Sequence, residues 1–340
     1  MADKRVWIAQ MAERDDWLAQ VEEDALDPAR EIVDPHHHLW DRNGSRYLLE
    51  RLWADTGSGH NVVQTVFVEC RSGYFENGPE HLQPVGETHF VAEIARASAE
   101  NPSGATVAAI VSHADLRHPE LDAVLDAHID AGQELFRGIR HAGAHEPSPD
   151  ALTIPGRAPA GLYADPDFRR GVARLGERGL TYDTWHYHHQ NRDFRDLALA
   201  VPGTTLVLDH FGTPLGVGPY AGRRAEIFAA WKDDIAAIAQ CPNVVAKLGG
   251  LAMPDNGFSW HERATPPTSD EFAEAQAPYY HHAIACFGPE RCMFESNFPV
   301  DRVSIGYAVL WNGLKKIAAD YDEAARTALF SGTARRVYRL

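Results

Sequence analysis

The chain has 340 residues, 44% of them hydrophobic and 24% charged, and this composition excludes a disordered chain, a collagen and a coiled-coil rod. The 32 basic and 48 acidic residues give a formal net charge of −16. Such an acidic surface repels phosphate backbones and anionic lipids, which argues against nucleic acid and membrane surfaces as partners. We therefore expect a small-molecule substrate.

The first 30 residues differ from the rest of the chain. Apolar residues recur there at roughly helical spacing among charges: Trp7, Ile8, Met11, Leu18 and Val21. We predict that residues 1–30 form a helical extension that packs on the main body or on a second subunit, which leaves a homodimer open. The four cysteines form no C-x-x-C pair, no signal peptide is recognisable, and no apolar run approaches the ~20 residues that span a bilayer. We expect a cytoplasmic protein.

From residue 31 onward, short β-rich runs alternate with amphipathic helical stretches. The strand candidates are Glu31–His36, Val62–Glu69, Ala105–Val111, Leu135–Arg140, Leu180–Thr184, Thr205–His210, Asn243–Leu248 and Cys292–Asn297. The helix candidates are Glu87–Glu100, Pro119–Ala131, Asp165–Arg178, Arg192–Ala200, Arg224–Gln240 and Asp270–Phe287, with a last pair within 303–340 and a mostly loop-like stretch at 39–61. This order predicts an α/β fold over residues 31–340, a single (β/α)8 TIM barrel, with a doubly wound sheet as the alternative.

Long connections follow three of the predicted strands. They are Ala142–Ala164, Phe211–Gly222 and Ala252–Ser269. Long βα loops inside a compact domain are usually lids or binding loops, although harmless surface insertions are the alternative. In a barrel all three would lie on the face where active sites are built.

The end of the first strand carries the most informative pattern, Asp34-Pro35-His36-His37-His38-Leu39-Trp40. Residues two apart in a strand share a face, so His36 and His38 can project together into the mouth of the barrel. Two imidazoles at that spacing can bind one divalent ion or polarise one carbonyl. A histidine-rich turn is the alternative, because 18 histidines make chance clusters common.

Other strand ends carry polar residues suited to substrate contact. Glu69 ends the second strand after an apolar run, where we expect desolvation to raise the pKa of its carboxyl toward the range of a general base. Arg140 and Lys247 offer fixed positive charge for a carboxylate or an oxyanion. The fifth strand ends in a polar and aromatic cluster from which we select Tyr182, Trp185 and His186 as substrate contacts. Salt bridges or core packing are the alternatives for each of these residues.

These motifs together resemble the amidohydrolase superfamily, specifically its lactonase-like branch (amidohydrolase family 2), which includes sugar-acid and pyrone-dicarboxylate lactonases. The resemblance rests on Asp-x-His-x-His-x-Trp at 34–40, Gly-Ile-Arg at 138–140, Leu-Asp-His-Phe-Gly at 208–212, Val-Ala-Lys-Leu-Gly-Gly at 245–250, Met-Phe-Glu-Ser-Asn-Phe-Pro-Val at 293–300 and Leu-Phe-Ser-Gly-Thr-Ala at 329–334. It implies a hydrolase in which His36, His38 and His210 hold a divalent ion or polarise an ester carbonyl.

The eighth strand departs from the family pattern. The family ends this strand with Gly-Ser-Asp-Trp-Pro, whereas this chain has Glu295-Ser296-Asn297-Phe298-Pro299. An amide cannot accept a proton from the attacking water, although Asn297 can still orient it. Glu295, two residues earlier on the same face, and Glu69 are the carboxylates that could replace the missing aspartate.

The sequence therefore predicts a hydrolase that opens a sugar-acid or aromatic-degradation lactone by water attack on the ester carbonyl. The expected catalytic residues are His36, His38, Glu69, His210, Glu295 and Asn297, and the expected substrate contacts are Arg140, Tyr182, Trp185, His186 and Lys247. A zinc or manganese ion held by His36, His38, Glu69 and His210 and a metal-free site are both left open. The alternative functions are a metal-dependent decarboxylase of an aromatic or unsaturated acid and a catalytically dead barrel that binds a sugar acid.

Overall fold

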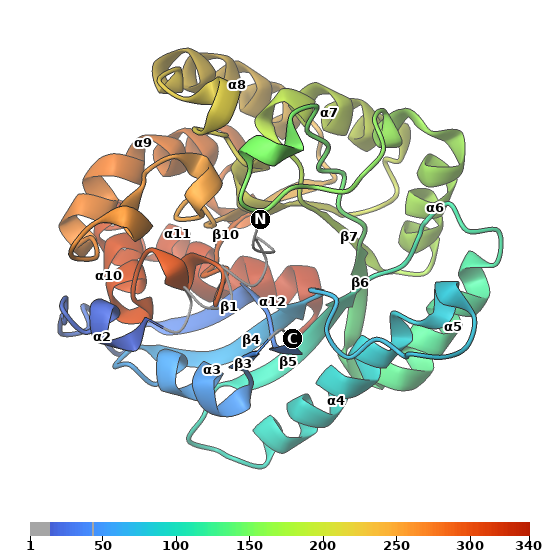
Figure 1. Cartoon of the computed structure of the whole chain (residues 1–340), viewed down its shortest axis with the longest axis horizontal. Coiled ribbons are helices and arrows are strands. Elements are labelled where there is room, and N and C mark those ends of the chain that lie inside the picture. Colours follow the sequence, from blue (N-terminus) through green and yellow to red (C-terminus); the bar gives the residue numbers. More distant parts are fainter. Residues whose placement is uncertain (1–13, 43) are drawn as a thin grey trace.

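The computed structural model describes residues 14–42 and 44–340. Eight parallel strands form one sheet in the order β1 Glu31–His37, β4 Asn61–Val68, β5 Thr106–Ser112, β6 Phe136–Arg140, β7 Thr181–Thr184, β8 Leu206–Leu208, β9 Val244–Leu248 and β10 Cys292–Phe294. The last strand returns to the first, because the N–H of Asn297 donates to the carbonyl of His36 (3.0 Å) and the N–H of His38 donates to that of Phe298 (2.8 Å). The predicted TIM barrel is confirmed (Figure 1).

Helices cover the outside of this barrel (Figure 1). They are α2 Asp15–Leu18, α3 Leu49–Thr56, α4 Val85–Ala99, α5 Leu121–Gly132, α6 Pro166–Glu177, α7 Asn191–Ala200, α8 Arg224–Ala239, α9 Ser269–Phe287, α10 Tyr307–Ile317, α11 Glu323–Thr327 and α12 Thr333–Tyr338. A π-helical turn joins α11 to α12, so the predicted last pair of helices corresponds to α10 and this joined segment.

The prediction of a mostly loop-like stretch at 39–61 is wrong. A hairpin of β2 Trp40–Arg42 and β3 Ser45–Tyr47 comes first, and α3 follows it. Each of these strands has three residues and α3 has eight, without a side-chain cap at its N-terminus. Elements this short lack both the periodicity and the start signal that sequence patterns detect.

Local sequence explains the regular elements. The inner end of β4, Val66-Phe67-Val68, is buried without exposed surface, as expected for a parallel strand covered on both faces. Asp165 caps α6 by accepting from the N–H groups of Asp167 and Phe168, and Pro166 takes the first helical position.

The barrel interior has an apolar lower layer and a charged upper layer. On three strands an apolar residue is followed two positions later by a charged one: Val207 and Asp209, Val245 and Lys247, Met293 and Glu295. Helix α12 closes the lower end, since Ala334, Val337 and Tyr338 pack against the apolar layer. Arg137, at the start of β6, donates to the carbonyl of Tyr338 (2.7 Å), which places α12 at the N-terminal ends of the strands.

The predicted N-terminal helix is only partly covered by the structure. Trp7, Ile8 and Met11 lie outside the described residues. The described part contains α2, whose Trp17 is buried against the barrel and donates through Nε1 to the carbonyl of Arg263 (3.1 Å). Within residues 14–42 and 44–340, no helix is long and apolar enough to cross a membrane.

Replacement of Gly171 by alanine should destabilise the barrel. Gly171 lies in α6, and a Cβ there would stand 1.9 Å from the carbonyl oxygen of Leu116, which is backbone and cannot rotate away. We expect Gly171→Ala to lower the free energy of unfolding by about 1–3 kcal/mol in urea denaturation. Gly203→Ala is the matched control, because its Cβ would meet nothing within 4 Å. Equal stability of the two variants would contradict the packing described for α6.

Candidate active site

A cavity of about 1290 Å³ opens at the C-terminal ends of the strands. Its floor is formed by His38, Glu69, Arg140, His210 and Asn297, and Trp185 contributes to the wall. These six residues come from six of the eight strand ends and were all predicted as site residues. The fold therefore brings them to one cavity, although the role of each stays a prediction.

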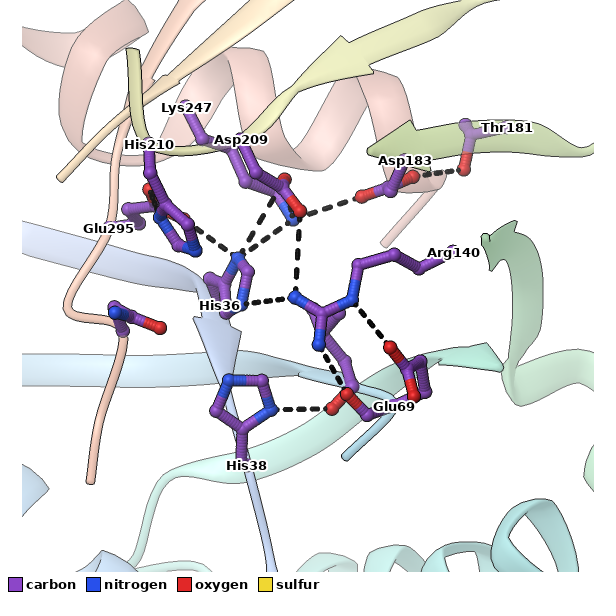
Figure 2. A network of polar contacts seen from close by, with 12 residues as sticks. His36, His38, Glu69, Arg140, Thr181, Asp183, Asp209, His210, Lys247 and Glu295 are labelled. Atoms are coloured by element: carbon purple, nitrogen blue, oxygen red, sulfur yellow. Dashed lines mark hydrogen bonds and ion pairs between the residues drawn. The ribbon is translucent and has the colours of Figure 1, made fainter. Parts of the chain in front are cut away.

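A charged layer that does not line the cavity adjoins these residues, with Lys247, Asp209 and Glu295 close to His36 (Figure 2). Lys247 is fully buried, and its Nζ lies 2.9 Å from Asp183 and 3.3 Å from Asp209. Glu295 is buried between two imidazoles: Oε2 lies 2.9 Å from Nδ1 of His36, and Oε1 accepts from Nδ1 of His210 at 2.7 Å. None of Lys247, Asp183 and Glu295 lines the cavity.

His36 stays a neutral imidazole within this layer. Burial, followed by the nearby charges of Lys247 and His210, holds the pKa of His36 well below its ordinary value. Its two ring nitrogens face cations, with Lys247 Nζ at 3.4 Å from Nδ1 and an Arg140 N–H at 3.3 Å from Nε2. Protonation there would place a third positive charge among two fixed ones.

His38 and His210 present their Nε2 atoms to the cavity. Nδ1 of His38 lies 2.8 Å from the carbonyl of Val68, which can only accept, so Nδ1 carries the hydrogen and Nε2 keeps a lone pair. The carboxylate of Glu295 orients His210 in the same way through Nδ1. Burial lowers the pKa of His38 well below its ordinary value, so this ring too is a neutral acceptor.

Two glycines after β9 make room for this arrangement. A Cβ on Gly249 would lie 2.4 Å from Cγ of Glu295, and a Cβ on Gly250 would lie 2.3 Å from Nδ1 of His210. His210 itself adopts the left-handed region at φ 55°. The Gly-Gly pair of the sequence motif is therefore a packing requirement of the Glu295–His210 contact.

The carboxylate of Glu69 is not free, because it forms an ion pair with Arg140. Nε of Arg140 donates to Oε1 of Glu69 at 2.9 Å. Burial alone would raise the pKa of Glu69, but Arg140, His113 and Arg71 lower it below the ordinary value. The expected rise in the pKa of Glu69 is therefore wrong, because the paired charge outweighs desolvation.

Asn297 is held by a residue that the sequence prediction did not select. Its Nδ2 donates to Oδ1 of Asp301 at 2.8 Å, and its backbone is left-handed at φ 56°. Asp301 is buried, and burial raises the pKa of its carboxyl to about 7. The sequence offered one indication of this contact, because Asp301 follows Asn297 by four residues and can lie in the same turn.

The structure places three predicted substrate contacts away from the cavity. The hydroxyl of Tyr182 donates to the carbonyl of His141 (2.8 Å) on the helix-facing side of β7. His186 is fully buried and contacts Asn191 at 3.0 Å through Nε2. Lys247 belongs to the charged layer.

His36, Asp209 and His210 could together hold a metal ion. One ligand atom from each lies within 4.8 Å of the others, and all three side chains are buried. Both carboxylate oxygens of Asp209 and Oε2 of Glu295 lack a hydrogen bond. Within the described residues, three carboxylates of the floor and charged layer pair with the two fixed cations, Arg140 and Lys247, and a fourth, that of Glu295, contacts only imidazoles. Two imidazoles and a carboxylate amid excess negative charge fit a divalent ion.

This grouping differs from the predicted ligand set. His36 and His210 belong to it and His38 does not, while Glu69 pairs with Arg140 and Asp209 takes its place as the carboxylate. Asp209 directly precedes His210 at the end of the apolar run Leu206-Val207-Leu208. A buried acid in that position was the signal for a ligand.

A TIM barrel with imidazoles and carboxylates at its C-terminal strand ends has the layout of a barrel enzyme. A sequence model of the amidohydrolase family (Amidohydro_2) matches residues 33–340, and the chain belongs to this family.

Individual relatives agree with this assignment. The chain is 31% identical over 331 residues to the uncharacterized protein y4mH of Sinorhizobium fredii, covering 91% of this chain and 98% of that one. It is 27% identical over 327 residues to an L-fucono-1,5-lactonase of Burkholderia multivorans, covering 91% and 96%. A solved amidohydrolase of Burkholderia multivorans with bound zinc gives a TM-score of 0.73 at 25% identity, covering 92% of this chain and all of that one.

A buried carboxyl fixes the turn that follows β4 and borders the cavity. Oε1 of Glu87 accepts from the N–H of Cys70 (3.1 Å) and from the N–H of Ser72 (2.7 Å). Burial and the neighbouring charge of Glu69 raise the pKa of Glu87 from its ordinary 4.5 to about 8. The folded state therefore keeps a proton on Glu87 that the unfolded state releases between these two values.

The stability of the protein should fall as pH rises from about 4.5 to about 8, through this group. Glu87→Gln keeps the accepting oxygen but cannot ionise, so the variant should lose this part of the pH dependence. In thermal melts, we expect the Tm of the wild type to fall relative to that of Glu87→Gln across pH 5–8. Parallel Tm curves would contradict a protonated Glu87.

Proposed function

We propose that this protein is a lactonase, a hydrolase that opens a cyclic ester by water attack on the carbonyl carbon. The observation that carries the proposal is the cavity floor, where His38 and His210 present Nε2 atoms beside Arg140 and Asn297. The 27% identity to an L-fucono-1,5-lactonase supports the same reaction.

His38 is the proton acceptor in this proposal. Its Nδ1 hydrogen is held by the Val68 carbonyl, so Nε2 can take a proton from the attacking water. The water oxygen bonds to the carbonyl carbon, the ring C–O bond breaks, and the proton on His38 passes to the departing alkoxide oxygen. The product is one open chain with a new carboxyl group and a new hydroxyl, and no oxidant or reductant is required.

Arg140 stabilises the negative charge that develops on the carbonyl oxygen, and Asn297 positions the attacking water. Arg140 is fixed against Glu69, which leaves its guanidinium at the floor to donate to the oxyanion. Asn297, anchored through Nδ2 by Asp301, can accept from the water through its amide oxygen. This role suits an amide, which orients a water without taking its proton.

His36, Asp209 and His210 are the residues that would hold a metal ion, and zinc is the ion bound in the Burkholderia multivorans amidohydrolase. A divalent ion bound there would supply Lewis-acid assistance to the ester carbonyl and to the attacking water, so that a weak base would suffice. His38, whose pKa burial lowers, is such a base. Glu295 would keep His210 oriented through Nδ1.

Replacement of His38 should remove turnover without unfolding the protein. We expect His38→Gln to lower kcat on a hydrolysed lactone by about 10²- to 10⁴-fold, because a positioned proton acceptor contributes that factor. Proton release in a weakly buffered indicator assay over sugar-acid and pyrone lactones measures it. His89→Gln, on the exposed face of α4, is the control. Wild-type turnover in His38→Gln would remove His38 from the mechanism, and release of carbon dioxide instead of acid would contradict the lactonase proposal.

Replacement of Asp209 should reduce metal binding. We expect the wild type dialysed against zinc to hold about one ion per chain by elemental analysis, and Asp209→Asn to hold much less, because the ligand set loses its carboxylate. Asp41→Asn, on the exposed part of the β2–β3 hairpin, controls for lost surface charge. The metal-free variant should melt lower than the metal-free wild type, since Asp209 pairs with Lys247 at 3.3 Å and Arg140 at 3.6 Å, so zinc content is compared at a temperature where both are folded. Equal zinc content in both would contradict the assigned ligands.

A further inference from the structure

The cavity lining has more arginines than carboxylates, although the protein as a whole is acidic. In a chain of net charge −16, the cavity is lined by five arginines, Arg42, Arg71, Arg117, Arg140 and Arg157, against three carboxylates, Glu69, Glu80 and Asp115. Two ion pairs use two of those carboxylates: Arg140 with Glu69 at 2.9 Å and Arg117 with Asp115 at 3.0 Å. Charge segregated in this way indicates an anionic ligand.

Two of the arginines that line the cavity, Arg42 and Arg71, have no carboxylate partner among the described residues. Neither guanidinium lies within 4.0 Å of a carboxylate of any residue that the structure describes. Arg42 stacks over the ring of Trp40 at 5.2 Å and donates to the carbonyl of Cys70, the residue before Arg71. The guanidinium of Arg42, from β2, is therefore held against the turn that carries Arg71, and both residues line the same cavity.

The turn that carries Arg71 is held in an unfavourable backbone conformation. Arg71 has φ 65°, in the left-handed region that a long side chain rarely adopts. Glu87 fixes both flanking residues by accepting from the N–H groups of Cys70 and Ser72. A strained residue imposed by a buried anchor at a cavity wall is typical of a ligand contact.

The neighbouring acids do not cancel this positive charge. Burial raises the pKa of Glu87 to about 8, so this carboxyl is uncharged at neutral pH. Glu69 is bound through Oε1 to Arg140. Arg71 itself makes no hydrogen bond with another described residue and is exposed at the wall, so its fork of N–H donors is available to a ligand.

We propose that Arg71 and Arg42 form an anion-binding subsite and that the substrate is a lactone with a carboxylate or phosphate group remote from its ester. The inference rests on the proposed function for the ester end. The cavity of about 1290 Å³ has room for a molecule that reaches from His38 and His210 at the floor to this turn. A guanidinium grips either anion with two parallel hydrogen bonds, which gives orientation as well as affinity.

The kinetic test compares matched lactones, each with a carboxylate, a phosphate or a neutral group at the same remote position. Arg71→Asn removes the charge and keeps a residue that tolerates positive φ, so the variant should fold. We expect kcat/KM for the charged lactones to fall about 10- to 100-fold, mostly through KM, while the neutral lactone is unaffected. The kcat/KM of Arg71→Lys for the charged lactones should lie between those of the wild type and Arg71→Asn, because lysine keeps the charge but not the forked pair of N–H donors.

Arg46→Gln is the control for lost surface charge, since Arg46 is exposed on the β2–β3 hairpin and outside the cavity lining. It should match the wild type on every substrate. An equal loss on charged and neutral lactones in Arg71→Asn, or no preference of the wild type for charged lactones, would overturn the subsite. The ratio of kcat/KM for the carboxylate lactone to kcat/KM for the phosphate lactone identifies which anion the subsite binds.

A binding measurement separates this proposal from the lactonase itself. Calorimetric titration with glutarate and with inorganic phosphate should show binding to the wild type that weakens about 10-fold or more in Arg71→Asn but not in Arg46→Gln. If this pattern holds while no lactone is hydrolysed, the lactonase proposal fails and the anion subsite stands. If lactones are hydrolysed but neither anion binds and no substrate preference appears, the subsite fails alone.

Discussion

The geometry of the cavity floor depends on one buried carboxylate, that of Glu295. It contacts His36 of β1 and His210 after β8 at once, and β9 and β10 separate these two strands around the barrel. Inside a protein such contacts are stronger than in water, and a lost partner is correspondingly costly. Glu295 lies beneath the floor and does not reach the cavity. Its contacts support the orienting role proposed for it, and the proton transfer expected of it stays a prediction.

The long loops act together rather than as separate lids. Asp255 accepts from the backbone N–H groups of Thr153 (2.7 Å) and Ile154 (2.8 Å), and Asn256 donates to the carbonyl of Pro214 (2.8 Å). These contacts tie the connections after β6, β8 and β9 into one wall. The turn after β4, which carries Arg71, takes no part in these loop contacts but lines the same cavity.

The sequence predicted those parts of the molecule that local patterns determine. The strands follow from apolar runs, and His38, Arg140 and His210 follow from polar residues at strand ends. The face of β7 could not be assigned, because alternation alone does not say whether Tyr182 or Asp183 points inward. The pKa of Glu69 could not be assigned either. It depends on Arg140, which lies 71 positions further along the chain and becomes a neighbour through folding.

Helix α12, which closes the lower end of the barrel, is synthesised last, and this affects the order of folding during synthesis. All eight strands leave the ribosome before α12, so a nascent chain can close the ring while its lower end is still open to water. Tyr338, whose hydroxyl donates to Asp183, reaches the charged layer from below and is made more than 40 residues after the last strand. Until then, Lys247 and its carboxylates remain hydrated from beneath. The electrostatics of the site are therefore completed by a segment that touches neither the cavity nor its ligand.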